Sequence, residues 1–420
     1  MTGLPTEPQA LAVESYRGLS LDPDRAGMLN LAWTTDEAAF LAADVFALVA
    51  DELAAEAAGG LPSVRDYRLQ DPYGEQALTA AVDAFFGLDG GHGVSAGAGV
   101  GPLLRELVDL GGRSPILTLS ETYPDFPAWA ARRARACLVW QPADAGGEDA
   151  VGIGRHVAAA LRAHGASLIF LERPALRPAP TDDLAVVEAI GRAVAGRGAH
   201  IVIDESNANY CPPEFSAATL TSRLDNLIVV RGLSKAYGLG GVRLGYCVSS
   251  APATEQVCRW VAPLQASSLA LRIGRGVLAM GDIAQPLRAR VSAQVGAATR
   301  VARQAGLAPA PAGRGLPYLL FPPDDDRPDR AETTLRALAE HGVQGKAHVS
   351  WGARGHAGTV RIGRISVPLD ADRAAQFARR LGAVGSDTVD QADGIDGIDG
   401  GENAEGEDSG EGGENGEGEG

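Results

Sequence analysis

Continuous apolar segments separated by amphipathic ones are the feature that most constrains this fold. From about residue 76, strand-like runs alternate with helical stretches such as VGIGRHVAAALRAHG; the runs include SPILTLS, ACLVWQP, SLIFLE, HIVIDE, NLIVVRG and LGYCVS. Strands that are apolar along their whole length are buried on both faces, which is typical of a mainly parallel sheet between two helix layers. The pattern therefore predicts an α/β fold whose ligands bind beyond the carboxyl ends of the strands.

The character of the chain changes near residue 285, where the helices and strands of a smaller α+β unit follow. For 420 residues we predict a large domain over 61–284 and a C-terminal small domain over 285–385. An N-terminal segment and helix over 1–60 are expected to belong to the small domain. Residues 386–420 are acidic and glycine-rich without an aromatic side chain, so we expect a disordered tail.

The net charge of −16 comes mostly from that tail, which holds thirteen acidic residues and no basic one from Asp387 onward. The body is left with −16 + 13 = −3, so it has no dominant basic face for nucleic acid. No apolar run is long enough to cross a membrane, and the N-terminus lacks a signal-peptide pattern. We therefore expect a cytoplasmic protein.

Cysteine spacing predicts neither a disulfide framework nor a metal site. The four cysteines are scattered without a CxxC pair or a zinc-like histidine spacing, and are Cys137, Cys211, Cys247 and Cys258. Such cysteines are typical of reduced thiols in a cytoplasmic protein.

Three charged groups stand at or just beyond strand ends. Asp204 ends HIVID, Lys235 follows NLIVVRGLS, and Arg243 follows the glycine-rich YGLGGV. A lysine amine forms a Schiff base with an aldehyde, and pyridoxal phosphate is the common aldehyde cofactor. Asp204 is a suitable partner for the cofactor's ring nitrogen, and Arg243 for its phosphate.

The segment GLSKAYGLGGVRLGY, with VIDESN upstream, resembles the class I/II aminotransferases, which are fold type I pyridoxal-phosphate enzymes. It looks closest to histidinol-phosphate aminotransferases and to relatives in antibiotic biosynthesis such as capreomycidine synthase. The resemblance covers roughly residues 28–380 and implies a homodimer whose substrates are small molecules, an amino acid and a keto acid. It also implies that Lys235 forms the cofactor aldimine and moves the Cα proton, through a quinonoid.

The resemblance assigns the other cofactor contacts. Asp204 pairs with the pyridinium nitrogen, and Ser234 and Arg243 hold the phosphate. In VSAGAGVGPLL, the backbone amides of Ala98 and Gly99 cradle that phosphate at a helix N-terminus. Tyr123 stacks on the ring.

Two further positions keep alternatives open. In TVRIGRISVP we favour Arg361 over Arg364 as the clamp on the substrate α-carboxylate, because VRI matches the family's LRI. Either Tyr67 or Tyr73 is expected to reach the phosphate of the neighbouring subunit.

Three departures from the family pattern fall around the cofactor's O3′ oxygen and the lysine. The usual NPNNPTG is ERPALRPAP, so the donor asparagine falls near Ala175 or Leu176. The usual tyrosine is Asn207, and Gly232 replaces a hydroxyl residue. Fewer donors to O3′ should raise the aldimine pKa, unless Asn207 substitutes.

Other readings compete with amino transfer. The departures motivate a lyase, cyclase, decarboxylase or oxidase of the same fold in secondary metabolism. The glycines at 97–101, followed by a helix and by Glu121, suggest a dinucleotide site of an oxidoreductase, although the spacing is G-x-G-x-G. No P-loop or G-x-S-x-G elbow is present. We predict an aminotransferase of α-amino acids.

Overall fold

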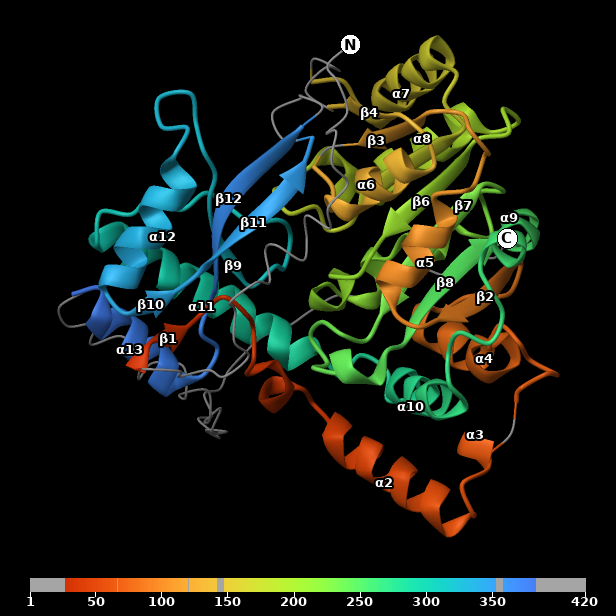
Figure 1. Ribbon diagram of the computed structural model, residues 1–420, viewed down its shortest axis with the longest axis horizontal. Helices are drawn as coiled ribbons and strands as arrows, with labels where there is room; N and C mark the ends of the chain where they lie inside the picture. The colour runs from red at the N-terminus through yellow and green to blue at the C-terminus, as the bar shows by residue number, and fades with distance from the viewer. Residues whose placement is uncertain (1–26, 66, 120, 142–146, 353–357, 383–420) are drawn as a thin grey trace, which may run out of the picture. The chain divides into compact units, whose positions relative to one another are not determined.

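The computed structural model describes residues 27–382 except 66, 120, 142–146 and 353–357. Its largest sheet has seven strands in the order β2-β8-β7-β6-β5-β3-β4 (Figure 1). The five strands β3 to β7 all run parallel to one another. Strand β8 is antiparallel to both of its neighbours, β7 and β2. The strands are β2 (His92–Gly97), β3 (Ile116–Leu119), β4 (Cys137–Trp140), β5 (Leu168–Glu172), β6 (His200–Asp204), β7 (Leu227–Gly232) and β8 (Gly245–Ser250).

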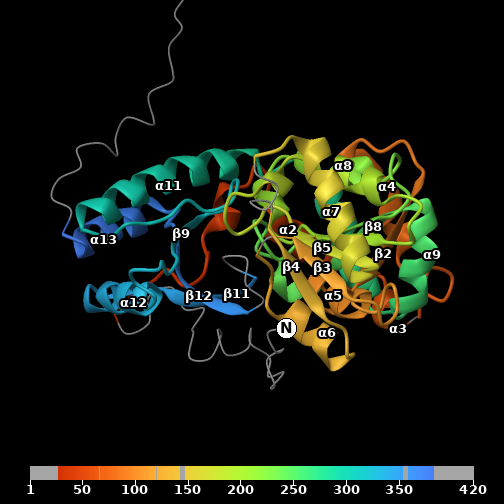
Figure 2. The same cartoon turned by 90° about the horizontal axis from the view of Figure 1, so that it is seen from above.

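Both faces of this sheet are buried under helices. Alternate residues of β5 and β6 point to opposite faces, so that Ile169 and Ile201 pack with α7 (Ala150–His164) and α8 (Leu184–Val194). Phe170 and Val202 pack on the other side, with α5 (Val100–Leu107), α6 (Asp125–Arg132) and α9 (Ala251–Trp260). Figure 2 shows the sheet between α7 and α8 on one side and α5 and α6 on the other. The predicted three-layer α/β fold is confirmed.

Side-chain caps fix where several helices begin. Asp149 accepts a hydrogen bond from the backbone of Gly152 at the start of α7, and Asp183 one from Ala185 at the start of α8. Gly165 ends α7 in the left-handed conformation, at φ 63°. These local signals are why the alternation could be predicted from sequence.

A second, antiparallel sheet has the order β11-β12-β9 and lies in the C-terminal third of the chain. Its strands are β9 (Tyr318–Phe321), β11 (Lys346–Trp351) and β12 (Thr359–Ser366), and its core includes side chains of α11 (Gln285–Gln304), α12 (Arg330–Glu340) and α13 (Ala371–Arg380). The short β1 (Leu29–Asn30) pairs in parallel with β10 (Val343–Gln344). The chain's beginning is thus joined to this unit.

Helix α2 (Val45–Ala58) instead contacts α10 (Ser268–Ala279). Both helices contribute to a hydrophobic cluster that also contains side chains of α4 (Glu75–Phe86) and β2. Residues 27–60 therefore touch both predicted domains, and the boundaries at 60, 284 and 385 stay predictions. Remaining short helices are α3 (Pro62–Arg65) and the 3₁₀ helices Glu37–Phe40, Pro180–Asp182, Ala208–Tyr210, Pro213–Phe215, Ala217–Leu220 and Gly240–Val242. The predicted tail lies outside the described residues. No helix in the described part of the chain combines the length and apolarity needed to span a bilayer.

Candidate active site

Asp204 and Lys235 lie at the carboxyl ends of neighbouring strands in the seven-stranded sheet. Strands β6 and β7 are parallel neighbours, with Asp204 paired in register with Val230. Asp204 is the last residue of β6, and Lys235 follows the end of β7 by three residues. The structure therefore places at neighbouring strand ends two residues that the sequence separates by thirty-one positions.

The Asp204 carboxylate is buried and has no cation beside it in the described part of the chain. Its Oδ1 accepts a hydrogen bond of 2.8 Å from the backbone of Ser206. Burial raises the pKa of Asp204 from its ordinary value of 3.8 to about 6, against the lowering effect of that hydrogen bond. A buried carboxylate of this kind is stabilised by a cationic ligand group.

Glu172 lies next to Asp204 across the β5–β6 ladder. It accepts hydrogen bonds from the backbone of Tyr123 and from the Thr122 hydroxyl. Burial, followed by the charge of Asp204, raises the pKa of Glu172 to about 8. The hydrogen bond to Glu172 holds the backbone of Tyr123 at the end of β5, the strand next to that of Asp204. The Tyr123 hydroxyl donates to Asp125 at 3.0 Å, and the centres of the Tyr123 and Trp129 rings are 6.2 Å apart.

The Lys235 amine lies among residues from distant parts of the chain. Its Nζ is 5.9 Å from the centre of the Trp33 ring. Burial lowers the pKa of Lys235, and the nearby charge of Arg364 lowers it further, whereas Glu37 acts in the opposite sense. Burial raises the pKa of Glu37 to about 8. These conditions favour the neutral, nucleophilic form of the amine.

A buried network positions the backbone around Lys235. The Asn209 amide donates to the carbonyls of Gly232 and Lys235, at 2.8 and 3.1 Å. Arg231 donates to the Asn209 side-chain oxygen at 2.8 Å and to Glu205 at 2.6 Å. Glu205 also binds Arg173, at 3.0 Å. One carboxylate thus neutralises part of the charge of two fully buried guanidinium groups.

The loop before α5 approaches Arg243 closely. Gly99 has φ 104°, and a Cβ built on it would lie 2.6 Å from Nη2 of Arg243. Arg243 donates to the carbonyls of Ala98 and Gly240, at 3.2 and 3.1 Å. Ser234 also lies near Gly240, because a Cβ there would be 4.0 Å from the serine Oγ. A hydroxyl, a guanidinium and helix-start amides near the end of β7 fit a phosphate group.

Residues 178–303 match the family model of aminotransferase class I and II. The chain is 36% identical over 164 residues to an aromatic amino acid aminotransferase of Corynebacterium jeikeium, covering 37% of this chain and 42% of the relative. It is 32% identical over 189 residues to a histidinol-phosphate aminotransferase of Shewanella amazonensis, covering 43% and 49%. Over this part of its length the chain is similar to class I and II aminotransferases. It spans less than half the length of these two curated relatives.

Solved structures of aminotransferases share the fold. A histidinol-phosphate aminotransferase from Sinorhizobium meliloti, in complex with pyridoxal-5′-phosphate, matches with a TM-score of 0.59 at 23% identity, over 79% of this chain and 85% of that one. An aspartate aminotransferase from Rhodobacter sphaeroides matches with a TM-score of 0.61 at 18% identity, over 84% and 92%. The fold of this chain is therefore the fold type I architecture of these aminotransferases.

The two arginines of β12 have different surroundings. The Arg361 side chain is 58% exposed and pairs with Glu332 of α12 at 3.1 Å. Arg364 is buried, and its guanidinium carbon lies 4.1 Å from the centre of the Tyr318 ring. Its charge lowers the pKa of Lys235. The two residues are three positions apart on one strand, so they occupy opposite faces. The match to LRI favours Arg361, whereas the burial of Arg364 and the effect of its charge on Lys235 favour Arg364.

The same face of the sheet carries two further basic groups that the sequence did not single out. Lys346 is the register partner of Arg364, and His348 follows two residues later on β11. The Lys346 Nζ lies 4.0 Å from the centre of the Trp33 ring, and burial together with the Arg364 charge lowers its pKa to about 5. Burial and the same charges lower the pKa of His348. No local motif marks these positions, because the hairpin register alone places them.

The departures from the aminotransferase pattern have local explanations in part. A Cβ at Gly232 would lie 2.8 Å from Cγ2 of Val100, so α5 starts too close for a larger residue. Ala175 and Leu176 are buried apolar residues. The Asn207 side-chain oxygen is buried and has no hydrogen-bond partner within the described residues. It is therefore available to a ligand at the turn after β6.

Tyr67 and Tyr73 differ in their surroundings. Tyr67 is 81% exposed, whereas the Tyr73 hydroxyl donates to the Cys258 carbonyl at 2.8 Å. The greater exposure of Tyr67 favours it over Tyr73, and contact of either with a second subunit stays a prediction.

The dinucleotide reading of the glycines at 97–101 gains no support. The preceding strand β2 is antiparallel to β8 at the edge of the sheet, so it does not open a parallel βαβ unit.

Proposed function

We propose that this protein is a pyridoxal-phosphate-dependent aminotransferase that moves the amino group of an α-amino acid to a keto acid. The observation that carries the proposal is the meeting of Lys235 and Asp204 at adjacent strand ends, beside the Ser234–Arg243 loop. The family match over 178–303 supports it, and so does the solved relative that holds pyridoxal-5′-phosphate.

The residues present fit this cofactor. Asp204, which is buried and has no cation beside it among the described residues, would pair with the protonated ring nitrogen. Arg243, Ser234 and the amides of Ala98 and Gly99 would hold the phosphate, and Tyr123 would cover the ring. The Gly99 amide would have to exchange its hydrogen bond to the Gly97 carbonyl, of 2.8 Å, for one to the phosphate. Asn207 has a buried amide oxygen without a partner in the described part of the chain; rotation of the amide would offer an N–H to O3′.

When bound, pyridoxal phosphate supplies an aldehyde that condenses with amines and a ring that accepts electrons from the substrate Cα. Lys235 would hold the cofactor and, once displaced by the substrate amine, carry the Cα proton on Nζ. Its lowered pKa favours the neutral amine that this proton transfer needs. Arg364 would bind the substrate α-carboxylate, in place of Arg361.

The proposal includes a homodimer in which the exposed Tyr67 contacts the cofactor phosphate of the second subunit. The replacements at Ala175, Leu176 and Asn207 support a specialised role in secondary metabolism.

The test is a visible spectrum of the purified protein with pyridoxal phosphate, before and after a panel of amino acids, for the wild type and for Lys235→Ala. We expect a yellow wild type that bleaches while keto acid appears, and a variant that no longer binds the cofactor covalently. Release of ammonia or carbon dioxide would replace amino transfer by another reaction of the fold. A wild type that does not take up the cofactor would overturn the proposal.

A further inference from the structure

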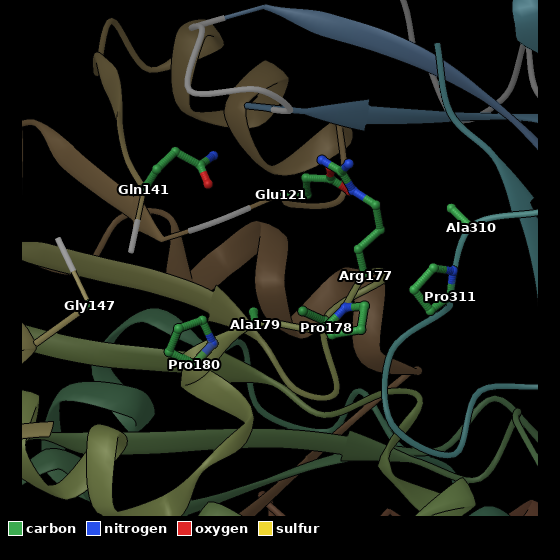
Figure 3. A pocket seen from close by; sticks show the side chains of 10 residues that line it. Glu121, Gln141, Gly147, Arg177, Pro178, Ala179, Pro180, Ala310 and Pro311 are labelled. Carbon is green, nitrogen blue, oxygen red and sulfur yellow. The ribbon is translucent and has the colours of Figure 1, made fainter. Parts of the chain in front are cut away.

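A cavity of about 660 Å³ opens beside the candidate active site, at the carboxyl ends of β3, β4 and β5. Its walls are mostly apolar and rigid, and are formed by Ala175, Pro178, Ala179, Pro180, Ala310 and Pro311. Figure 3 shows Glu121 and Arg177 together on one wall, with Gln141 across from them. A volume of this size accommodates a long amino-acid side chain.

Glu121 and Arg177 carry the charges among the described lining residues, and they form an ion pair. The two partners differ in freedom. Glu121 follows β3 and is 5% exposed, so its carboxylate is fixed inside the wall. The Arg177 side chain is 36% exposed and stands on the loop after β5. Arg177 can therefore turn towards water when another cation takes its place, whereas Glu121 cannot leave the cavity.

A row of acidic side chains connects the cavity with the proposed cofactor site. Glu172 is influenced by both Asp204 and Glu121, so three carboxylates follow one another along the ends of β3, β5 and β6. Ala175, three residues after Glu172, lines the cavity and occupies one of the positions expected near O3′. A substrate bound at Lys235 could thus direct its side chain towards Glu121.

We propose that this cavity receives the side chain of a basic α-amino acid, and that Glu121 binds its terminal amine or guanidinium while Arg177 turns outward. The inference rests on the proposed aminotransferase function and adds the substrate class. The cationic group of the ligand would take the place of the Arg177 guanidinium, so that the buried Glu121 carboxylate stays paired. A ligand anion at Arg177 would instead lie beside Glu121 and near Glu172, where like charges repel.

The test compares L-ornithine with L-norvaline, which has the same carbon chain without the terminal amine. For the holoenzyme we expect a kcat/KM ratio that favours ornithine by about 10- to 100-fold, the range of a charge-assisted hydrogen bond. Glu121→Gln should reduce this ratio towards one. Arg177→Met should raise it, because Glu121 then lacks its internal partner. Glu188→Gln breaks a Glu–Arg pair on α8, with Arg192, and should leave the ratio unchanged.

A second readout is the dissociation constant of ornithine from Lys235→Ala loaded with pyridoxal phosphate, measured by calorimetry with and without Glu121→Gln. Weaker ornithine binding with unchanged norvaline binding supports the proposal. Should Glu121→Gln fail to fold, the direction of the Arg177→Met effect decides. A wild type that reacts equally with both probes, or prefers L-glutamate, overturns the basic-substrate inference alone. A wild type that reacts with no amino acid overturns the proposed function as well.

Discussion

The side-chain amide of Asn209 binds the backbone carbonyl of Lys235 at 3.1 Å, which ties the candidate catalytic lysine to a buried ionic network. The same amide donates to Gly232, and its oxygen accepts from Arg231. The backbone around the lysine is therefore held by two hydrogen bonds from one side chain.

Asn209→Ala should loosen this segment. Two carbonyl groups and one buried guanidinium lose a partner, so we expect a loss of about 1–3 kcal/mol in the free energy of unfolding. Cofactor release should also become faster, because the Lys235 backbone is freer. Urea unfolding and the rate of absorbance loss on dilution measure the two effects. Asn226→Ala, at the opposite end of β7, is the control, and equal effects of both variants would contradict the assignment.

Glu205→Gln should be more harmful, because it leaves Arg173 and Arg231 buried with no carboxylate between them. Breaking a buried ion pair on one side costs about 3–5 kcal/mol, so the variant should unfold at much lower urea or fail to accumulate. Glu188→Gln, which breaks a surface pair, should change stability by less than about 1 kcal/mol. Near-native stability of Glu205→Gln would show that the network is unimportant.

Gly232→Thr tests why a hydroxyl residue is missing three positions before the lysine. The new Cβ would lie 2.8 Å from the Val100 side chain at the start of α5. We expect a loss of about 1–3 kcal/mol from overpacking, and weaker cofactor binding because α5 must shift. Adding Val100→Ala should recover most of both losses. If the double variant is no better than the single one, the contact with Val100 is not the cause.

Arg364→Met and Arg361→Met separate the two arginines of β12. Loss of a charge-assisted bond to the substrate carboxylate should raise the KM for the amino acid about 10- to 100-fold in the Arg364 variant. Arg361 binds Glu332 on the exposed face, so its replacement should change KM less than about twofold. The reverse order would restore the assignment made from the sequence motif.

Asp204 makes the stability of the apoprotein depend on pH. Its pKa is about 6 in the fold and near 3.8 when unfolded, so the unfolded chain releases this proton first as pH rises. The stabilising contribution is complete below pH 4 and is lost between about pH 4 and 6, by about 3 kcal/mol. Asp204→Asn should therefore be increasingly more stable than wild-type apoprotein over this interval, while binding the cofactor less tightly. A stability difference that does not vary with pH would refute this account.

The sequence was sufficient for groups whose place depends on local signals. Asp204 and Lys235 could be located because apolar runs define β6 and β7, and the ends of parallel strands meet. Arg243 could be located because a glycine-rich turn returns the chain to the same edge. For these residues, knowledge of the strand was enough.

The sequence was insufficient where pairing between distant segments decides the geometry. Whether Arg361 or Arg364 faces the lysine depends on the register of β12 with β11 and β9, which no local pattern encodes. Trp33 lies beside both Lys235 and Lys346, although these three residues are far apart in the sequence. The cavity at Glu121 depends on a loop near residue 310, which the helix–strand alternation did not place.

The pairing of β1 with β10 has a consequence for the birth of this protein on the ribosome. Leu29 cannot pair before Val343 has been synthesised, which happens 343 − 29 = 314 residues later. At about 5–20 residues per second, translation leaves the first strand without its partner for roughly 15–60 seconds. During that time the seven-stranded sheet can already be complete, since its last strand ends at Ser250. The newborn chain thus carries an open edge near its N-terminus that the last third of translation must close.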